Sequence, residues 1–165
     1  MEFAFYRGPG GLFTYLIRLW TRSPHSHVEV RFSLPATQSY TSDYKNNTPL
    51  SFSSSEQDKG VRFKHIAYRP ERWDFLPSKD MTTDEEVSLM HKCEAYVGKE
   101  YDWLGIGGFL LQKVPIIKGN PNKWFCSKMI GLIAGWVGLL SDEWKKLSPQ
   151  GLAPGELYKK LKQKE

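Results

Sequence analysis

Alternating apolar and polar residues in the first half of the chain predict β-strands. Residues 27–32 read HVEVRF, a strict alternation that places the two valines and Phe32 on one face of a strand. His27, Glu29 and Arg31 then share the opposite face. Three polar side chains on one face must border a cleft or solvent, so this strand is the first candidate for a functional surface.

Three other segments are also expected to be strands, at residues 2–6, 50–54 and 61–67. The last two are joined by a polar turn that contains Asp58 and Gly60, and both would extend the sheet begun by the histidine strand. The stretch 35–48 is rich in Ser, Thr, Asn and Tyr and is expected to be a polar loop.

Helical periodicity predicts helices at residues 12–20, 84–97, 125–140 and 154–164. The second would begin with a capping box in which Thr83 accepts from the backbone and Glu86 reaches back, and it would end at Gly98. Cys93 lies in the apolar stripe of that helix and is expected in the core. Cys126 instead falls in the first turn of the third helix.

This order of elements predicts an α+β fold. A chain of 165 residues with 40% hydrophobic residues suits one domain spanning 1–165. We expect a small antiparallel sheet, packed on one side by the Cys126 helix and the helix at 84–97. A short basic helix would close the chain.

Composition excludes several classes of protein. The formal charge of +5 is modest, and we interpret the C-terminal lysines as a solvated helix face: Lys159, Lys160, Lys162 and Lys164. No aromatic residues on which bases could stack are interleaved with these lysines, so no nucleic-acid partner is expected. Two cysteines are too few for a disulfide framework. We expect no signal peptide, and no apolar stretch is long enough for a transmembrane segment.

A cysteine at a helix N-terminus is well placed for nucleophilic chemistry. The helix dipole and the free backbone N–H groups there stabilise a thiolate, and the same N–H groups can accept the oxyanion of a tetrahedral intermediate. Cys126 has this position and Cys93 does not. The simpler interpretation is that Cys126 is a small buried apolar residue.

His27 is the candidate base, because a strand holds an imidazole rigidly. Glu29 lies on the same face and would orient the ring, although a hydroxyl on the next strand, such as that of Ser53, could do so instead. Zinc binding by His25, His27 and Cys126 is a further alternative. Pro24 puts His25 in a turn and no fourth ligand is evident, so we expect no metal and no cofactor.

The strand SHVEV, the segment GKEYDWLGIGG and the helix start WFCSKMIG together resemble the NlpC-type cell-wall peptidase superfamily. The usual pattern of that superfamily is Gly-x-x-Tyr-x-x-Gly before a helix-starting Cys-Ser, with a His-Val-Gly strand elsewhere. In this chain the histidine precedes the cysteine. That order matches the circularly permuted branch, which includes the YiiX-like proteins and is similar to the lecithin:retinol acyltransferase group. The Ser-His-Val-Glu sequence resembles the corresponding sequence in members from tailed bacteriophages.

The resemblance implies a permuted papain-like fold in which Cys126 is the nucleophile and His27 the base. Tyr101 would help to position the oxyanion or the substrate, and Gly98 matches the leading glycine. Gly105 lies one residue further from Tyr101 than the pattern has it.

The pattern is also altered at the third site residue. Glu29 replaces the small residue that usually follows His-Val, and the strand that supplies a polar residue offers Ser53 or Ser54. The third site residue is therefore Glu29, Ser53 or Ser54.

The function that these features imply is a cysteine-nucleophile hydrolase or acyltransferase acting on an amide, ester or thioester. The substrate would be a peptidoglycan stem peptide or an acyl group on a lipid or protein. A phage-encoded protein of this kind would be cytoplasmic or virion-associated. The alternative is a non-catalytic binding or virion-structural protein with the same fold.

Overall fold

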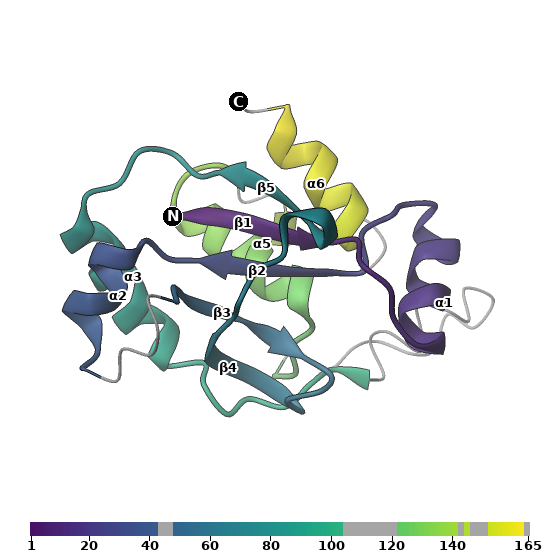
Figure 1. Ribbon diagram of the computed structural model, residues 1–165, viewed down its shortest axis with the longest axis horizontal. Helices are drawn as coiled ribbons and strands as arrows, with labels where there is room; N and C mark the ends of the chain where they lie inside the picture. Colours follow the sequence, from purple (N-terminus) through teal and green to yellow (C-terminus); the bar gives the residue numbers. More distant parts are fainter. Residues whose placement is uncertain (43–47, 104–121, 142–143, 146–151, 164–165) are drawn as a thin grey trace.

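The protein has a mixed α+β architecture built on one five-stranded antiparallel sheet (Figure 1). The computed structural model describes residues 1–42, 48–103, 122–141, 144–145 and 152–163. The strands are β1 (Glu2–Tyr6), β2 (His27–Arg31), β3 (Leu50–Ser55), β4 (Gly60–His65) and β5 (Trp73–Pro77). They lie in the order β4-β3-β2-β1-β5, so β2, which carries His27, is the central strand.

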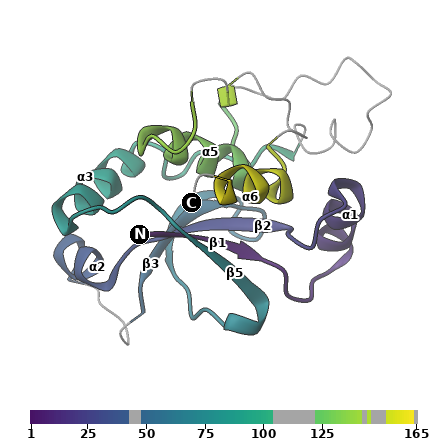
Figure 2. The same ribbon diagram turned by 90° about the horizontal axis from the view of Figure 1, so that it is seen from above.

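The described part of the chain contains five α-helices: α1 (Leu12–Thr21), α2 (Leu34–Tyr40), α3 (Thr83–Glu94), α5 (Cys126–Trp136) and α6 (Pro154–Lys162). Seen from above, α3, α5 and α6 lie along the same side of the sheet, while α1 stands at one end (Figure 2). Helix α5 contacts β2, β3 and α6.

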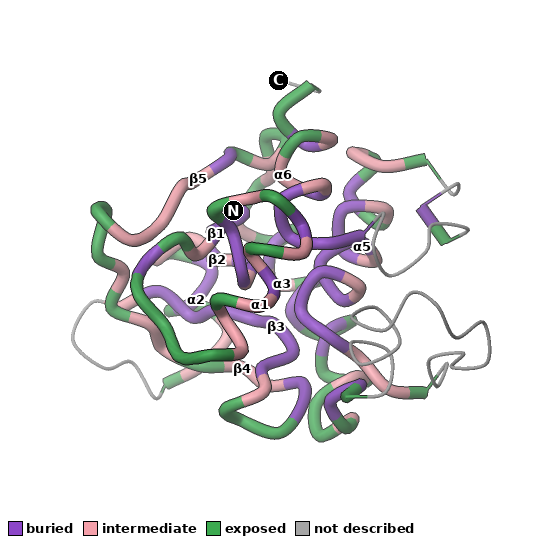
Figure 3. Tube along the Cα trace, turned by 90° about the vertical axis from the view of Figure 1, so that its right-hand side faces the viewer, coloured by how far each residue is buried: buried purple, intermediate pink, exposed green. Residues whose placement is uncertain are grey.

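The core lies between α5 and the apolar face of the sheet. Val28 and Val30 on β2 and Met129 and Ile130 on α5 are fully buried. Buried residues run along most of α5 (Figure 3). Cys93 is also fully buried in this core, as the helical periodicity predicts. The tight packing of α5 fixes the position of its first residue, Cys126.

Most predicted elements are confirmed to within a few residues, and the exceptions have local causes. Residues 35–40, expected in a loop, belong to α2, because the Ser33 side chain caps the N-terminus of this helix and Pro35 suits its first turn. Strand β5 was not expected. The final helix, predicted to reach residue 164, is described to Lys162, and Lys164 is outside the described residues.

The predicted capping box of α3 is wrong by one residue. Thr82, rather than Thr83, accepts from the Glu85 N–H, and the Glu85 side chain reaches back to Thr82. Glu86 therefore takes no part in the capping box. Its carboxylate accepts a 2.8 Å hydrogen bond from the Ser33 N–H at the start of α2. This contact joins α2 to α3.

Candidate active site

Glu29 and His27 on β2 form a hydrogen-bonded pair. They are two residues apart on the same face, and His27 Nε2 lies 2.6 Å from Glu29 Oε1. The alternation of the sequence predicts this shared face. Because Nε2 is directed at the carboxylate, Nδ1 is the ring nitrogen left for another partner.

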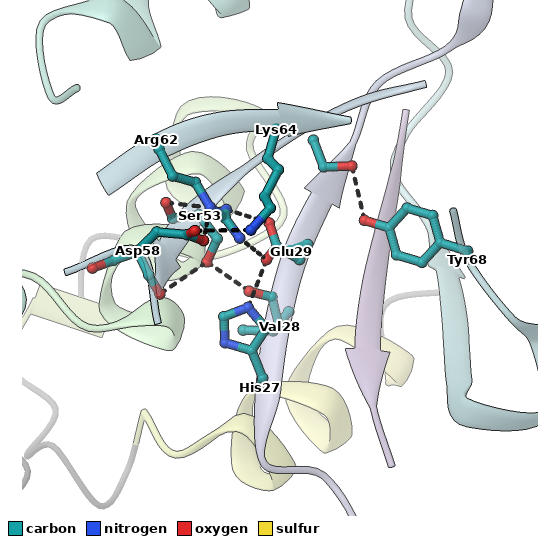
Figure 4. Close-up of polar contacts among 10 residues, drawn as sticks. His27, Val28, Glu29, Ser53, Asp58, Arg62, Lys64 and Tyr68 are labelled. Atoms are coloured by element: carbon teal, nitrogen blue, oxygen red, sulfur yellow. Dashed lines mark hydrogen bonds and ion pairs between the residues drawn. The ribbon is translucent and has the colours of Figure 1, made fainter. Parts of the chain in front are cut away.

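The Glu29 carboxylate is almost completely buried, with 1% of its side chain exposed, and Arg62 on β4 neutralises it. The two terminal nitrogens of Arg62 donate to the two carboxylate oxygens at 2.8 and 2.7 Å (Figure 4). Burial raises the pKa of Glu29, but the charge of His27 and the hydrogen bonds of Arg62 outweigh it and keep the pKa below its ordinary value. Glu29 is therefore ionised at neutral pH.

Arg62 is itself held in place by an acidic residue of the β3–β4 turn. Its Nε donates to Asp58 Oδ2 at 2.7 Å, and Lys64 Nζ donates to Asp58 Oδ1 at 2.8 Å (Figure 4). These contacts hold the pKa of Asp58 down, at about 2, although burial acts to raise it. Sequence reasoning missed Arg62 as a site residue. The sequence signal that could have identified Arg62 was a basic residue on β4, which is separated from β2 by one strand of the sheet.

Cys126 is the first residue of α5, as the sequence predicts. Phe125 is the N-cap residue, and its side chain forms no hydrogen bond with the N–H groups of the first turn. The Cys126 residue is 5% exposed. Its sulfur therefore lies at the positive end of an 11-residue helix, where a negative charge is stabilised.

His27 and Cys126 interact electrostatically. Burial acts to lower the pKa of His27, but the charge of Cys126, the charge of Glu29 and hydrogen bonding to both raise it to about 10. Of these two partners, Glu29 is bonded to the ring at 2.6 Å. The imidazole is thus protonated at neutral pH, bonded to the Glu29 carboxylate and next to the Cys126 sulfur.

Tyr101 lies beside the same thiol. It is 4% exposed and pairs with Trp124, two residues before Cys126. Burial and the nearby charges, those of Cys126 first among them, raise the pKa of Tyr101 well above its ordinary value of 10.0. The phenol therefore stays protonated and can act as a hydrogen-bond donor.

A cavity of about 350 Å³ borders this group. Its lining includes the aromatic and aliphatic residues Tyr6 of β1, Phe13 and Ile17 of α1, and Trp73 of β5. The lining also includes polar and charged residues: His27, Glu29, Glu56, Asp58, Arg62 and Lys64. Cys126 is not among the described lining residues. His27 and Tyr101, which do line the cavity, both interact with its thiol.

The serines proposed as alternatives to Glu29 bind elsewhere. Ser53 Oγ donates to the carbonyl O of Val28 at 2.7 Å, and Ser54 Oγ donates to the carbonyl O of Trp124 at 2.6 Å. Neither is bonded to His27 in the structure, and the carboxylate of Glu29 takes that place. Gly105, the other uncertain match, lies outside the described residues.

The zinc alternative has no support from geometry. His25 is turned to Asp74, with Nε2 2.7 Å from Oδ2, and stacks on Tyr158 at 4.4 Å between ring centroids. Across the described ranges, no group of three or more His, Cys, Asp or Glu side chains is arranged to hold a metal ion. Among the described residues, no helix has both the length and the apolarity that crossing a membrane requires.

Comparison with known proteins assigns no family to this chain. No protein-family model matches the sequence, and no curated protein matches it either.

Proposed function

We propose that the protein is a cysteine-nucleophile hydrolase or acyltransferase that acts on an amide, ester or thioester carbonyl. Cys126 is the nucleophile, His27 the general acid and base, and Glu29 the residue that orients the imidazole. The fold that goes with this assignment is the permuted papain-like type, with the histidine strand before the nucleophile helix. The packing of α5 on β2 and β3 supports it.

The observation that carries the proposal is the convergence of three groups. His27 is bonded to a buried carboxylate and interacts with a cysteine at a helix N-terminus, and the pKa of the imidazole is raised to about 10 as a result. A protonated imidazole beside a thiolate is the resting state that cysteine hydrolases use. A structural cysteine such as Cys93 has neither partner; burial alone raises its pKa, to about 12.

The chemistry follows from these positions. The Cys126 thiolate adds to the carbonyl carbon, and the Tyr101 hydroxyl and the first-turn N–H groups of α5 stabilise the oxyanion. His27 donates its proton to the leaving amine, alcohol or thiol, and the carbon–nitrogen, carbon–oxygen or carbon–sulfur bond of the substrate breaks to leave a thioester on Cys126. Water or another acceptor then loses a proton to His27 and attacks the thioester, which releases the Cys126 thiolate beside a protonated imidazole.

The cavity favours substrates that carry both apolar and polar groups. Its lining includes the aromatic residues Tyr6, Phe13 and Trp73 and the charged residues Asp58 and Lys64. An acyl group attached to a polar peptide or headgroup suits this mixed lining. Peptidoglycan stem peptides and acyl groups on lipids or proteins are therefore the two substrate classes to compare.

The test compares wild type, Cys126→Ala and Cys93→Ala on a panel of stem peptides, acyl esters and acyl thioesters. We expect wild type and Cys93→Ala to release product from one class and Cys126→Ala to lose at least about 10³-fold in rate, since nucleophile and base act as a unit. Iodoacetamide at pH 7 should modify Cys126 in the folded protein and leave Cys93 intact.

Both cysteines should react after unfolding in urea, which controls for access of the reagent. A folded protein in which Cys126 reacts no faster than Cys93, with no turnover on the panel, would favour a binding or virion-structural role and overturn the proposal.

A further inference from the structure

Arg62 is the least expected residue of the site. Glu29 is 1% exposed, and a carboxylate so far from solvent is stable as an anion only when its oxygens are paired. His27 takes one position on Oε1, and Arg62 takes a second position on Oε1 and one on Oε2. Removing Arg62 would break two of these three contacts, and the carboxylate would keep only its hydrogen bond with His27.

The imidazole cannot hold the carboxylate alone, since His27 must lose its proton during turnover. At that moment a Glu29 without Arg62 would be a buried, uncompensated charge, and it would take up a proton or turn toward water. A guanidinium remains charged at every working pH and binds a carboxylate through two parallel bonds, so it keeps Glu29 anionic in both states of the ring.

Asp58 and Lys64 extend the arrangement outward. Asp58 binds the third donor of Arg62, its Nε, and thereby fixes the plane of the guanidinium. The side chain of Arg62 is 16% exposed and that of Lys64 is 47% exposed, so the chain of alternating charges runs from solvent to the imidazole. A lysine at position 62 would supply charge without this planar fork.

We propose that Arg62 is a positioning residue, which holds ionised Glu29 against His27 and so determines how well the imidazole activates Cys126. The inference rests on the proposed function. Arg62 acts through Glu29, and its other anchor, Asp58, sets the direction from which the guanidinium approaches.

Other charged or titratable groups also face this centre and can affect its pH dependence. They come from α5, the β3–β4 turn, β4 and the segments that follow β4 and α3: Cys126, Glu56, Asp58, Lys64, Tyr68 and Tyr101. Tyr68 is bonded to Ser51 and its pKa is raised by burial and by the charge of Glu29, so it stays neutral.

The experiment measures alkylation of Cys126 by iodoacetamide between pH 5 and 9 in Arg62→Ala, Arg62→Lys and wild type. Because a less firmly held imidazolium stabilises less of the Cys126 thiolate, we expect Arg62→Ala to slow the reaction at pH 7 by at least about tenfold and to move the profile to higher pH. Arg62→Lys should fall between the two. Millimolar guanidinium should restore part of the rate to Arg62→Ala, and urea should not.

Arg31→Ala is the matched control. Arg31 also lies on the sheet, but the glutamate it pairs with, at 2.9 Å, is Glu2. Its profile should match wild type. The guanidinium rescue keeps the test valid even where Arg62→Ala lowers stability.

The outcomes separate the two proposals. A wild-type Cys126 that is no more reactive than Cys93 overturns the proposed function itself. A reactive wild type with an unchanged profile in Arg62→Ala overturns only the role of Arg62. On an active substrate, a raised KM with unchanged kcat and alkylation would make Arg62 a substrate-binding residue and would also overturn the inference.

Discussion

Ser54 on β3 holds the chain immediately before the candidate nucleophile, because its Oγ donates a 2.6 Å hydrogen bond to the carbonyl O of Trp124. The same carbonyl accepts the Asp102 N–H at 3.1 Å, and Trp124 pairs with Tyr101. One peptide group thus joins the sheet, the Tyr101 segment and the residue two places before Cys126. The serine that the family pattern offered as an orienting group instead anchors the approach to α5.

Ser54→Ala should therefore impair the site as well as the fold. Loss of this buried hydrogen bond should lower the free energy of unfolding by about 1–2 kcal/mol. The alkylation rate of Cys126 should fall too, because the peptide before α5 is less well fixed. Ser51→Ala is the control: Ser51 is on the same strand and bonds Tyr68 at 2.9 Å, away from Trp124. A reactivity loss of equal size in both variants would contradict this local role.

The pKa of His27 should depend on Cys126. The charge of Cys126 is the largest of the contributions that raise this pKa to about 10, so Cys126→Ala should lower it. Glu29→Gln should also lower it. Titration of the His27 ring by nuclear magnetic resonance measures the change directly.

Cys93→Ala provides the control for that titration, since Cys93 is buried in the core and has no part in the pKa of His27. An equal pKa for His27 in wild type and Cys126→Ala would show that the two side chains do not interact in solution.

The central part of the site could be predicted from the sequence because it depends on local geometry. A period of two on β2 places His27 and Glu29 on one face, and the start of an apolar helix identifies Cys126. Each inference needs only a few neighbouring residues. The same is true of Cys93, whose helical spacing assigns it to the core.

Arg62 could not be found in this way. Its partnership with Glu29 depends on strand order and register, in which β3 lies between β2 and β4 and Ser53 pairs with Arg62. Many registers fit the same alternating pattern, and a shift of one residue would turn Arg62 to the other face. The capping of α3 failed for a related reason: adjacent threonines, Thr82 and Thr83, offer the same local signal, and a distant contact of Glu86 with Ser33 accompanies the register found.

His25 and His27 should give opposite pH dependences of folding stability. Burial lowers the pKa of His25 below 6.5, despite its bond to Asp74, so the unfolded chain binds the extra proton and stability falls as the pH drops below 6.5. The pKa of His27 is raised from 6.5 to about 10, so its contribution is complete below pH 6.5 and is lost as the pH rises through about 10.

Urea unfolding of wild type, His25→Gln and His27→Gln between pH 5 and 10 tests both signs. His27→Gln should flatten the decline on the alkaline side, and His25→Gln should flatten the decline on the acid side. Parallel curves for wild type and both variants would contradict the assigned shifts.

Gly60→Ala should disturb Tyr101 from a distance. A Cβ at Gly60 would lie 2.2 Å from the backbone O of Lys99, a contact that backbone must move to relieve, and Tyr101 N–H donates to the carbonyl O of Lys59 at 3.2 Å. Overpacking of this kind lowers the free energy of unfolding by about 1–3 kcal/mol. Movement of residues 99–101 should also displace the Tyr101 phenol, so turnover should fall even at temperatures where the variant is fully folded. Gly11→Ala adds the same methyl group where no atom lies within 4 Å, so it should cause no such overpacking and should leave Tyr101 in place. If Gly60→Ala lost stability but kept the wild-type kcat, the segment that carries Tyr101 would have no part in stabilising the oxyanion.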